Sequence, residues 1–237
     1  MKISLIIPAR NEERLLGGCL QSVREAAERA AVEVETVVVL NRCTDGTEQI
    51  ARAAGALVVC DDTKCLAHIR NTGAKASSGE ILVTIDADSR MSPNLLAEIA
   101  KALRDERVVG GSVRIMLERL SLGLVLTLLL LLPILLVMRI SGGSFWVRRE
   151  TYFALGGFDE RLRSFEDVDF ALRLRRHARS RGKRARILLR GHIVTSCRKF
   201  DRFGDWYLLR RPSVALALVR HCADPRLEDE LWYDAGR

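Results

Sequence analysis

The feature that most constrains the fold is an alternation, over the first hundred residues, of short apolar runs with longer amphipathic segments. The runs are rich in Val, Ile and Leu and have the length of buried strands. The segments between them repeat apolar residues at helical spacing. This alternation predicts an α/β fold with a mostly parallel central sheet flanked by helices. We expect strands at 3–7, 34–40, 56–60, 80–85 and 108–115, and helices at 12–31, 45–55, 65–76 and 92–106.

Polar residues follow three of these strands, at positions that a parallel sheet brings to one edge. Segment 8–11 follows the first strand, 41–45 follows the second, and Asp86-Ala87-Asp88 follows the fourth. Ligands of such sheets bind outside the carboxyl ends of the strands. Carboxylates are also the ligands that Mg²⁺ or Mn²⁺ prefers. The spacing therefore indicates a metal site, although an aspartate that ends a strand and caps a turn has the same spacing.

A second group of carboxylates stands at the start of a helix expected from Phe165 to Arg176. The helix dipole would stabilise Glu166 and Asp167 there as anions. An ionised Asp167 would serve as a general base toward a hydroxyl group. The alternative is a capping arrangement between Ser164 and Asp167.

Other polar residues have structural interpretations. Asp45 and Glu48 have the spacing of a capping box, and Ser92 before Pro93 is the usual order of an N-cap and a first helical residue. His192 stands alone, and a lone histidine is more often structural than a ligand. We expect it to bind metal only if the fold returns it to the aspartates.

The excess of basic residues indicates which classes of partner the protein could bind. Lys and Arg outnumber Asp and Glu by 38 to 30, and many of the basic residues lie between positions 173 and 190. Such a patch suits nucleic acid, an anionic membrane or phosphorylated substrates, but a solvated helix face followed by a basic loop explains it equally well. It lacks the interleaved aromatic residues of a single-strand binding surface. We therefore expect no nucleic-acid partner.

The cysteines and the N-terminus indicate the compartment. The six cysteines form no C-x-x-C pair, so neither a zinc site nor a disulfide framework is expected. The first apolar run is too short for a signal peptide. A reducing, cytoplasmic setting is the expectation.

Residues 122–138 are almost wholly apolar. As a helix they would be about 25 Å long, which is short of a bilayer core of about 30 Å. A helix that is apolar all round is buried or embedded in a membrane, and a domain of this size has little room to bury it. We expect peripheral membrane attachment aided by the basic surface, with a buried or re-entrant helix as the alternatives.

Short motifs occur in a fixed order along the chain. They are IIPARNEE at 6–13, NRCTDGT at 41–47, RN at 70–71, GEILVTIDAD at 79–88, GGFDE at 156–160 and FEDVDF at 165–170. In this order and spacing the chain closely resembles the family 2 glycosyltransferases of the GT-A fold. The resemblance runs from residue 2 to about residue 176.

The resemblance implies a role for each matching residue. The nucleotide-sugar pocket would contain Pro8, Ala9, Arg10, Glu12, Asn41, Asp45, Arg70, Asp86 and Ala87. Asp88 would bind the metal, Mg²⁺ or Mn²⁺, with Asp86 shared between metal and ribose and His192 as a candidate additional ligand. Asp167 would be the catalytic base, paired with Glu166. Asn41 stands where many relatives carry an aspartate, which leaves the base of the donor open.

The implied reaction is an inverting transfer of a sugar from a nucleotide diphosphate to an acceptor hydroxyl. Asp88 precedes the apolar stretch and Asp167 follows it, so a single membrane crossing would separate the metal from the base. We therefore expect a cytoplasmic enzyme at the inner face of the membrane, with a lipid or lipid-linked acceptor.

Three regions follow from this interpretation. Residues 1–115 would form the nucleotide-sugar-binding α/β half, 116–140 the apolar membrane-associating or buried segment, and 141–237 the acceptor-binding half with the catalytic base and a basic C-terminal region. Two other functions stay open. One is a catalytically silent nucleotide-sugar-binding or scaffold protein of the same fold. The other is a nucleotidyltransferase, which the lack of a Gly-rich phosphate loop after the first strand disfavours.

Overall fold

The computed structural model describes residues 1–138, 143–162, 165–206 and 210 of the 237-residue chain. The strands are β1 (Lys2–Ala9), β2 (Glu33–Leu40), β3 (Leu57–Cys60), β4 (Ile81–Thr84), β5 (Ser89–Met91), β6 (Val108–Leu117), β7 (Phe145–Arg148) and β8 (Arg184–Thr195). The helices are α1 (Leu16–Ala30), α2 (Thr47–Ala53), α3 (Leu66–Ala76), α4 (Leu95–Leu103), α5 (Leu122–Met138), α6 (Arg149–Ala154), α7 (Glu166–Ser180) and α8 (Arg198–Phe203).

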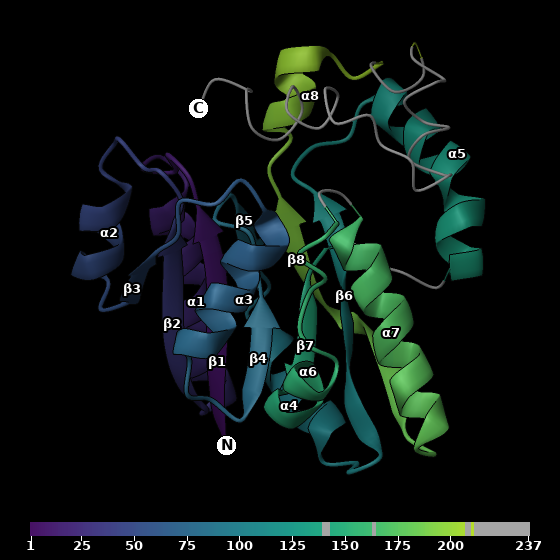
Figure 1. The fold of residues 1–237 in the computed structure, drawn as a ribbon. Helices are drawn as coiled ribbons and strands as arrows, with labels where there is room; N and C mark the ends of the chain where they lie inside the picture. The colour runs from purple at the N-terminus through teal and green to yellow at the C-terminus, as the bar shows by residue number, and fades with distance from the viewer. Residues whose placement is uncertain (139–142, 163–164, 207–209, 211–237) are drawn as a thin grey trace.

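These strands form one sheet in the order β3-β2-β1-β4-β7-β6-β8-β5 (Figure 1). Strands β3, β2, β1 and β4 are parallel to one another, and β6 is parallel to β8. Strand β7 runs antiparallel to β4 and β6, and β5 runs antiparallel to β8. The predicted α/β fold with a mostly parallel sheet is confirmed. Strands from both predicted halves share this one sheet, so the sheet marks no boundary between them. The division into three regions stays a prediction.

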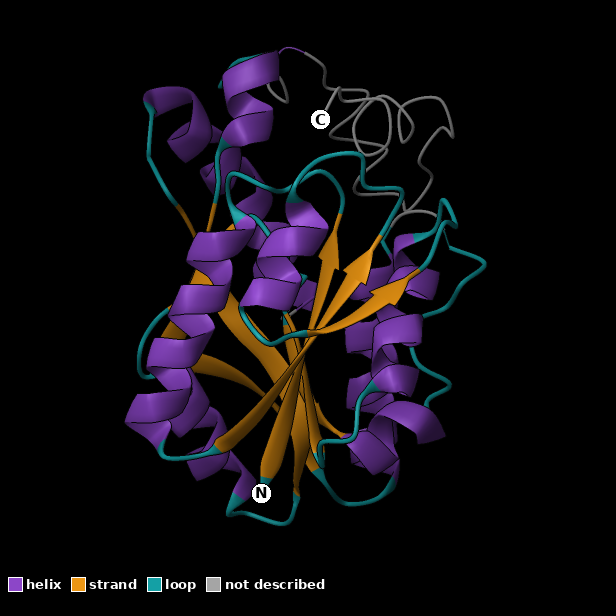
Figure 2. Ribbon diagram, turned by 90° about the vertical axis from the view of Figure 1, so that its left-hand side faces the viewer, coloured by secondary structure: helices purple, strands orange, loops and turns teal. Residues whose placement is uncertain are grey.

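Helices cover both faces of the twisted sheet (Figure 2). The alternation of side chains along β1 shows how the faces divide. Leu5 and Ile7 pack in a cluster with residues of α1 and α4, whereas Ile6 packs in a second cluster with residues of α3 and α7. Burial on both faces is why the run from 3 to 7 is apolar except at Ser4.

The carboxyl ends of the parallel strands meet at one edge, as predicted. The backbone N–H of Asn41 donates to the carbonyl of Ala9 (2.8 Å), and that of Asp61 donates to the carbonyl of Leu40 (2.9 Å). These bonds continue the ladders beyond the strands and fix the starts of the loops that follow.

Helix α3 lies directly against the sheet because Gly73 has no side chain. A Cβ at that position would stand 2.6 Å from Cγ2 of Ile6 and 2.8 Å from Cγ2 of Val39. This close approach brings the middle of α3, including Arg70, down to the carboxyl edge of β1 and β4.

Two helix starts differ from the prediction. Glu48 bonds to Arg52 (2.8 Å), one turn further on, instead of closing a capping box with Asp45. The hydroxyl of Ser92 accepts a hydrogen bond from the backbone N–H of His192 (3.0 Å), and α4 begins three residues later. Both side chains have alternative partners that spacing alone does not show.

The basic stretch is not a helix followed by a loop. Helix α7 extends to Ser180, and the basic residues after it continue into β8, where Arg184 and Arg186 pair with β6. Exposed arginines interrupt the apolar residues of β8, so its hydropathy pattern does not indicate a strand.

The apolar stretch forms α5, which confirms the predicted apolar helical segment, and it stands apart from the sheet (Figure 1). Leu124 and Thr127 are buried. More than a third of the side-chain surface is exposed at Leu122, Val125, Leu126, Leu128, Leu129, Leu130 and Leu132. Among the described residues, no helix combines the length and hydropathy that a membrane span requires.

Candidate active site

The centre of the candidate site is the buried guanidinium of Arg70 on α3. Its Nη1 donates to Oε1 of Glu166 (2.8 Å), and its Nη2 donates to Oδ1 of Asp86 (3.2 Å). The guanidinium also lies 5.2 Å from the centre of the Phe158 ring. Burial alone would lower the pKa of Arg70, but Asp86 and Glu166 raise it, so the group stays charged. Arg70 thus joins the predicted metal motif to the pair that contains the predicted base.

The neighbouring Asn71 holds α3 in place. Its Oδ1 accepts from the Tyr152 hydroxyl (2.6 Å) and the Phe158 N–H (2.9 Å), and its Nδ2 donates to Phe158 O (2.9 Å) and Glu160 Oε1 (2.8 Å). Gly157 adopts a φ of +71°, and a Cβ there would stand 2.4 Å from Asn71 Oδ1. The turn at 156–160 therefore has a structural role: it fixes Asn71 and places Phe158 against Arg70.

Asp167 follows Glu166 in the first turn of α7. Burial raises the pKa of both carboxyls against the lowering effect of Arg70. Oδ1 of Asp167 accepts from the N–H of Val168 (2.8 Å), and a Cβ added at Gly143 would lie 3.5 Å from Oδ2. Among the described residues, no side chain is recorded as donating a hydrogen bond to Oδ2. A carboxylate with a raised pKa and an oxygen that no side chain engages is suited to general-base chemistry.

The two aspartates of the metal motif point to different partners. Asp86 lies beside Arg70 with about half of its side chain exposed, 52%. Oδ2 of Asp88 accepts from the Ser196 hydroxyl (3.0 Å) and from Arg198 Nη2 (3.2 Å). The residues between them turn sharply, since the N–H of Ser89 donates to the carbonyl of Asp86 (3.0 Å).

The donor set of Asp86 and Asp88 fits a divalent cation in part. Carboxylate oxygens suit Mg²⁺ or Mn²⁺, which often complete their coordination with substrate phosphates. In the part of the chain that the structure describes, no three His, Cys, Asp or Glu side chains are grouped to hold a metal. The residues therefore fit a metal that is held jointly by the protein and a diphosphate.

The sequence did not point to Arg198, which reaches the site from α8. Its guanidinium forms a bidentate pair with Glu12, at 2.9 Å to each carboxylate oxygen, and also bonds Asp88. Glu12, predicted to line the nucleotide pocket, is buried at this contact. Arg198 follows shortly after the end of a strand, β8, and this position could have marked it as a candidate site residue. The prediction would have required recognising β8 in the sequence first.

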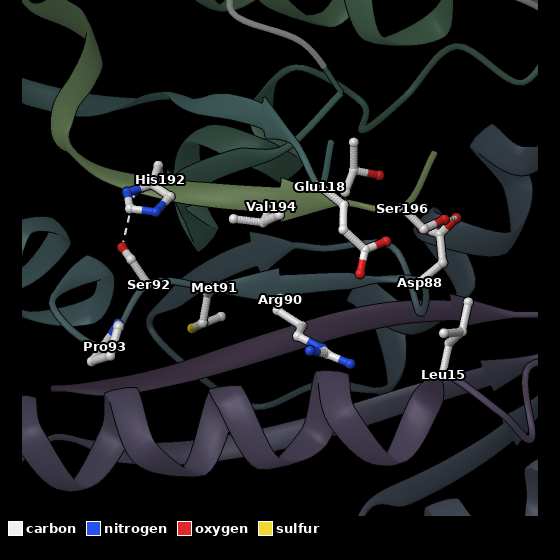
Figure 3. A pocket seen from close by; sticks show the side chains of 11 residues that line it. Leu15, Asp88, Arg90, Met91, Ser92, Pro93, Glu118, His192, Val194 and Ser196 are labelled. Carbon is white, nitrogen blue, oxygen red and sulfur yellow. Dashed lines mark hydrogen bonds between the residues drawn. The ribbon is translucent and has the colours of Figure 1, made fainter. Parts of the chain in front are cut away.

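His192 does not join the aspartates. A cavity of about 350 Å³ is lined by residues of the paired strands β5 and β8, with Asp88 and Ser196 at one end and His192 at the other (Figure 3). Arg90 and Glu118 line the space between them. The geometry gives no support to His192 as a metal ligand, and that assignment stays a prediction.

Asn41, which follows β2, is hydrogen-bonded to the loop after β3. Its Nδ2 donates to the carbonyls of Asp61 (2.5 Å) and Thr63 (2.8 Å), and its Oδ1 accepts from Arg42 (3.1 and 3.3 Å). An aspartate in this place would set a carboxylate against two carbonyl oxygens. Asn41 is therefore needed as a donor, and its predicted contact with the nucleotide stays untested.

The Asp61 carboxylate completes this loop. It accepts from the hydroxyls of Thr63 (2.6 Å) and Thr72 (2.6 Å) and contacts His68 Nδ1 at 2.7 Å. Burial alone would raise the pKa of Asp61, but these hydrogen bonds lower it to about 2. The loop after β3 is thus anchored to α3, close to Arg70.

The remaining predicted residues line the same edge. Asp45 accepts from the N–H groups of Glu13 (3.1 Å) and Thr47 (3.0 Å), so it ties two loops together. Ala9 and Ala87 are buried in the core, which leaves only their backbone for a ligand. Pro8 and Arg10 are partly exposed.

Comparisons with known proteins agree with this architecture. The family model described as glycosyl transferase family 2 matches residues 4–153. The bactoprenol glucosyl transferase of Shigella phage SfV is 31% identical over 133 residues, and the match covers 48% of this chain and 42% of that protein. The chain therefore spans less than half of this relative's length.

Two solved structures share the fold. S. aureus TarS 1–349 in complex with UDP-GlcNAc has a TM-score of 0.64 at 17% identity, over 98% of this chain and 70% of that one. The mannosyltransferase PcManGT from Pyrobaculum calidifontis, in complex with GDP-Man and Mn²⁺, has a TM-score of 0.62 at 24% identity, over 81% of this chain and 56% of that one. These likenesses confirm the GT-A fold.

Proposed function

This chain belongs to glycosyl transferase family 2, whose model matches residues 4–153, and on that premise we propose that it transfers a sugar from a nucleotide-diphosphate donor to an acceptor hydroxyl. The observation that carries the proposal is the position of Arg70. One buried guanidinium contacts Asp86 on the donor side and Glu166, next to Asp167, on the acceptor side. Donor and acceptor chemistry therefore meet at one edge of the sheet.

Asp167 is the better candidate for the base than Glu166. The Glu166 carboxylate is held by Arg70 at 2.8 Å. Asp167 has a carboxylate oxygen that no side chain engages among the described residues, next to the chain at Gly143. Both carboxyls have raised pKa values because they are buried, so Asp167 can accept a proton readily once a hydroxyl lies against it.

The proposed step is a single displacement. The acceptor oxygen forms a bond to the anomeric carbon, its proton passes to Asp167, and the bond from that carbon to the diphosphate oxygen breaks. The configuration at the anomeric carbon is thereby inverted. Asp88 and Asp86 would hold Mg²⁺ or Mn²⁺, which supplies positive charge for the leaving diphosphate. Arg70 keeps Glu166 and Asp86 in place and balances their charge.

We further propose a lipid or lipid-linked acceptor. The Shigella phage relative is described as acting on bactoprenol, although it is longer than this chain. On this chain, α5 exposes leucines over most of its described length. The helix leads through residues 139–142 to Gly143, beside Asp167. An apolar helix that precedes Gly143 in the chain suits an acceptor presented from the inner face of a membrane.

A panel of nucleotide-sugars, assayed with Mn²⁺ or Mg²⁺ and a membrane-lipid extract as acceptor, tests the function. We expect release of nucleoside diphosphate with at least one donor, and loss of this release when the metal is chelated. A nucleotidyltransferase would instead release pyrophosphate when a nucleoside triphosphate and a sugar 1-phosphate replace the nucleotide-sugar in the same assay. Donor binding by calorimetry without turnover across the panel would identify a silent binding protein.

A further inference from the structure

The guanidinium of Arg198 lies where a cation is expected. Its two terminal nitrogens bond both oxygens of the buried Glu12 carboxylate at 2.9 Å, and Nη2 is 3.2 Å from Oδ2 of Asp88. A second donor, the Ser196 hydroxyl, reaches the same Asp88 oxygen at 3.0 Å. The carboxylate that the proposed function assigns to the metal is thus already paired with a positive charge.

The position of Arg198 is fixed by contacts outside the site. It starts α8, and Asp201 and Asp205, in and just after this helix, both bond the guanidinium of Arg119. The carbonyl of Arg119 in turn accepts from the thiol of Cys197 (3.6 Å). These bonds join α8 to the segment before α5, so the fold itself holds Arg198 against Glu12 and Asp88.

Electrostatics then distinguishes two ways for a divalent cation to enter. A free cation carries two positive charges and must approach Asp88 beside the guanidinium, which repels it and competes for the same carboxylate. The diphosphate of a nucleotide-sugar carries two negative charges and offsets those of the cation, so the guanidinium does not repel this complex and can donate hydrogen bonds to its phosphate oxygens. The complex of the cation with inorganic pyrophosphate has a net negative charge and is attracted. Arg198 therefore disfavours the free cation but not the cation bound to a diphosphate.

We propose that Arg198 is an internal counter-cation of the metal site, which keeps the affinity for free metal low and makes metal binding depend on the diphosphate. This inference rests on the proposed function, because it takes Asp88 as a metal ligand. Arg198 would act through Asp88 and Glu12 and not on the reacting atoms. Its effect would be that the metal binds together with the diphosphate and not before it.

The test is the binding of MnCl₂ to the purified full chain, measured by calorimetry without any nucleotide. We expect Arg198→Met to bind Mn²⁺ about tenfold more tightly than the wild type, since a competing positive charge is removed. Arg107→Met is the control for net charge. Its side chain is 65% exposed and lies at the opposite end of the sheet. The control should bind Mn²⁺ as the wild type does.

Inorganic pyrophosphate serves as the second probe because it has the diphosphate chemistry without a base or sugar. In the wild type, saturating pyrophosphate should raise the Mn²⁺ affinity, and in Arg198→Met this enhancement should fall by about tenfold. The inference is overturned if the folded variant binds free Mn²⁺ no better than the wild type. It is also overturned if the pyrophosphate enhancement is unchanged.

Two further variants serve as controls for these measurements of Mn²⁺ affinity. Removal of Arg198 takes away the bidentate partner of buried Glu12 and will lower stability. Arg198→Lys, which keeps the charge, is therefore measured in parallel and should bind free Mn²⁺ within about threefold of the wild type. Weak Mn²⁺ binding shared by wild type and Arg198→Lys, together with tight binding by Arg198→Met that Asp88→Asn abolishes, supports the inference even if no donor turns over. Metal-dependent turnover with unaltered Mn²⁺ binding in Arg198→Met would reject the inference and leave the proposed function standing.

Discussion

Asp167, the proposed catalytic base, is a single side chain whose ionisation affects the stability of the protein. Burial raises its pKa, so the native protein binds a proton at this carboxyl more readily than the unfolded chain does. The stabilising effect of that proton is present at low pH and is lost as the pH rises from the unfolded pKa through the native one. At neutral pH the ionised Asp167 therefore lowers the free energy of unfolding, which is expected of a residue kept for chemistry.

Replacing this carboxyl should separate activity from stability. We expect Asp167→Asn to lower kcat by about 10² to 10⁴-fold and to raise Tm by a few degrees, because the amide is neutral and nearly isosteric. The control is Asp169→Asn, on the same turn of α7, whose carboxylate pairs with Arg173 at 2.6 Å. Turnover assays and thermal unfolding check both variants.

The dependence of kcat/KM on pH is an independent test of Asp167 as the base. For the wild type and Asp169→Asn, kcat/KM should fall on the acid side with a midpoint above the ordinary aspartate pKa of about 4. Near-normal turnover by Asp167→Asn, or an acid midpoint at or below that of an exposed aspartate, would remove Asp167 from the mechanism.

Single residues also show what the sequence can and cannot predict. Asp86, Arg70 and Glu166 were predicted from separate motifs, and the structure brings them together. Asn41 was predicted near the donor base, yet its amide is engaged by the loop after β3. Arg198 was missed because it acts across 110 residues on Asp88, and a side-chain contact at that separation has no local spacing.

Among the elements, β1 and β2 are joined to the turn before β4 by one carboxylate. Glu35 accepts from the Ser4 hydroxyl (2.6 Å) and from the N–H and hydroxyl of Ser78 (both 2.7 Å). Burial alone would raise the pKa of Glu35, but these hydrogen bonds lower it to about 2. The stabilisation is complete above the unfolded pKa and is lost as the pH falls through about 2.

Glu35→Gln should therefore destabilise the sheet in a pH-dependent way. We expect a loss of about 2 kcal/mol at pH 7, since hydrogen bonds to a charged group are the stronger kind. The difference from the wild type should shrink toward zero near pH 2. Glu33→Gln, whose carboxylate is 70% exposed and lies 3.7 Å from Lys2, should change stability by less than about 1 kcal/mol. Urea unfolding across this pH range measures both, and a constant difference would contradict the role of the charge.

The strands that the sequence predicted are those that contain apolar runs. Strands β1, β2 and β4 bury apolar residues on both faces, which explains their runs. Strand β8 was missed because its exposed arginines resemble a basic loop, and the three-residue β5 is too short for a periodic pattern. β5 and β8 pair with each other, and β8 also pairs with β6. No local stretch of sequence contains these long-range pairings.

At the scale of the whole molecule, the alternation of strands and helices predicted the sheet but not how the chain halves combine. Strand β7 comes after the apolar helix and enters between β4 and β6. This insertion brings the predicted base to the metal motif within one core. The residues that we propose bind metal and act as the base consequently lie at one edge of the sheet, and α5 stands apart from it (Figure 1).

The exposed face of α5 and the net charge of +8 together predict binding of the full chain to phospholipid vesicles. Burying one leucine side chain contributes about 1.5 to 3 kcal/mol, so Leu129→Glu on α5, where 57% of the side chain is exposed, should lower the vesicle partition coefficient by tenfold or more. Leu57→Glu introduces the same charge at a leucine of similar exposure, 44%, on β3, and should leave binding nearly unchanged. Anionic vesicles should bind the wild type more tightly than zwitterionic ones, and added salt should reduce that preference while the contribution of Leu129 persists. Co-sedimentation measures all three proteins. Equal binding by the two variants would show that α5 does not contact the membrane, because only its apolar face distinguishes them.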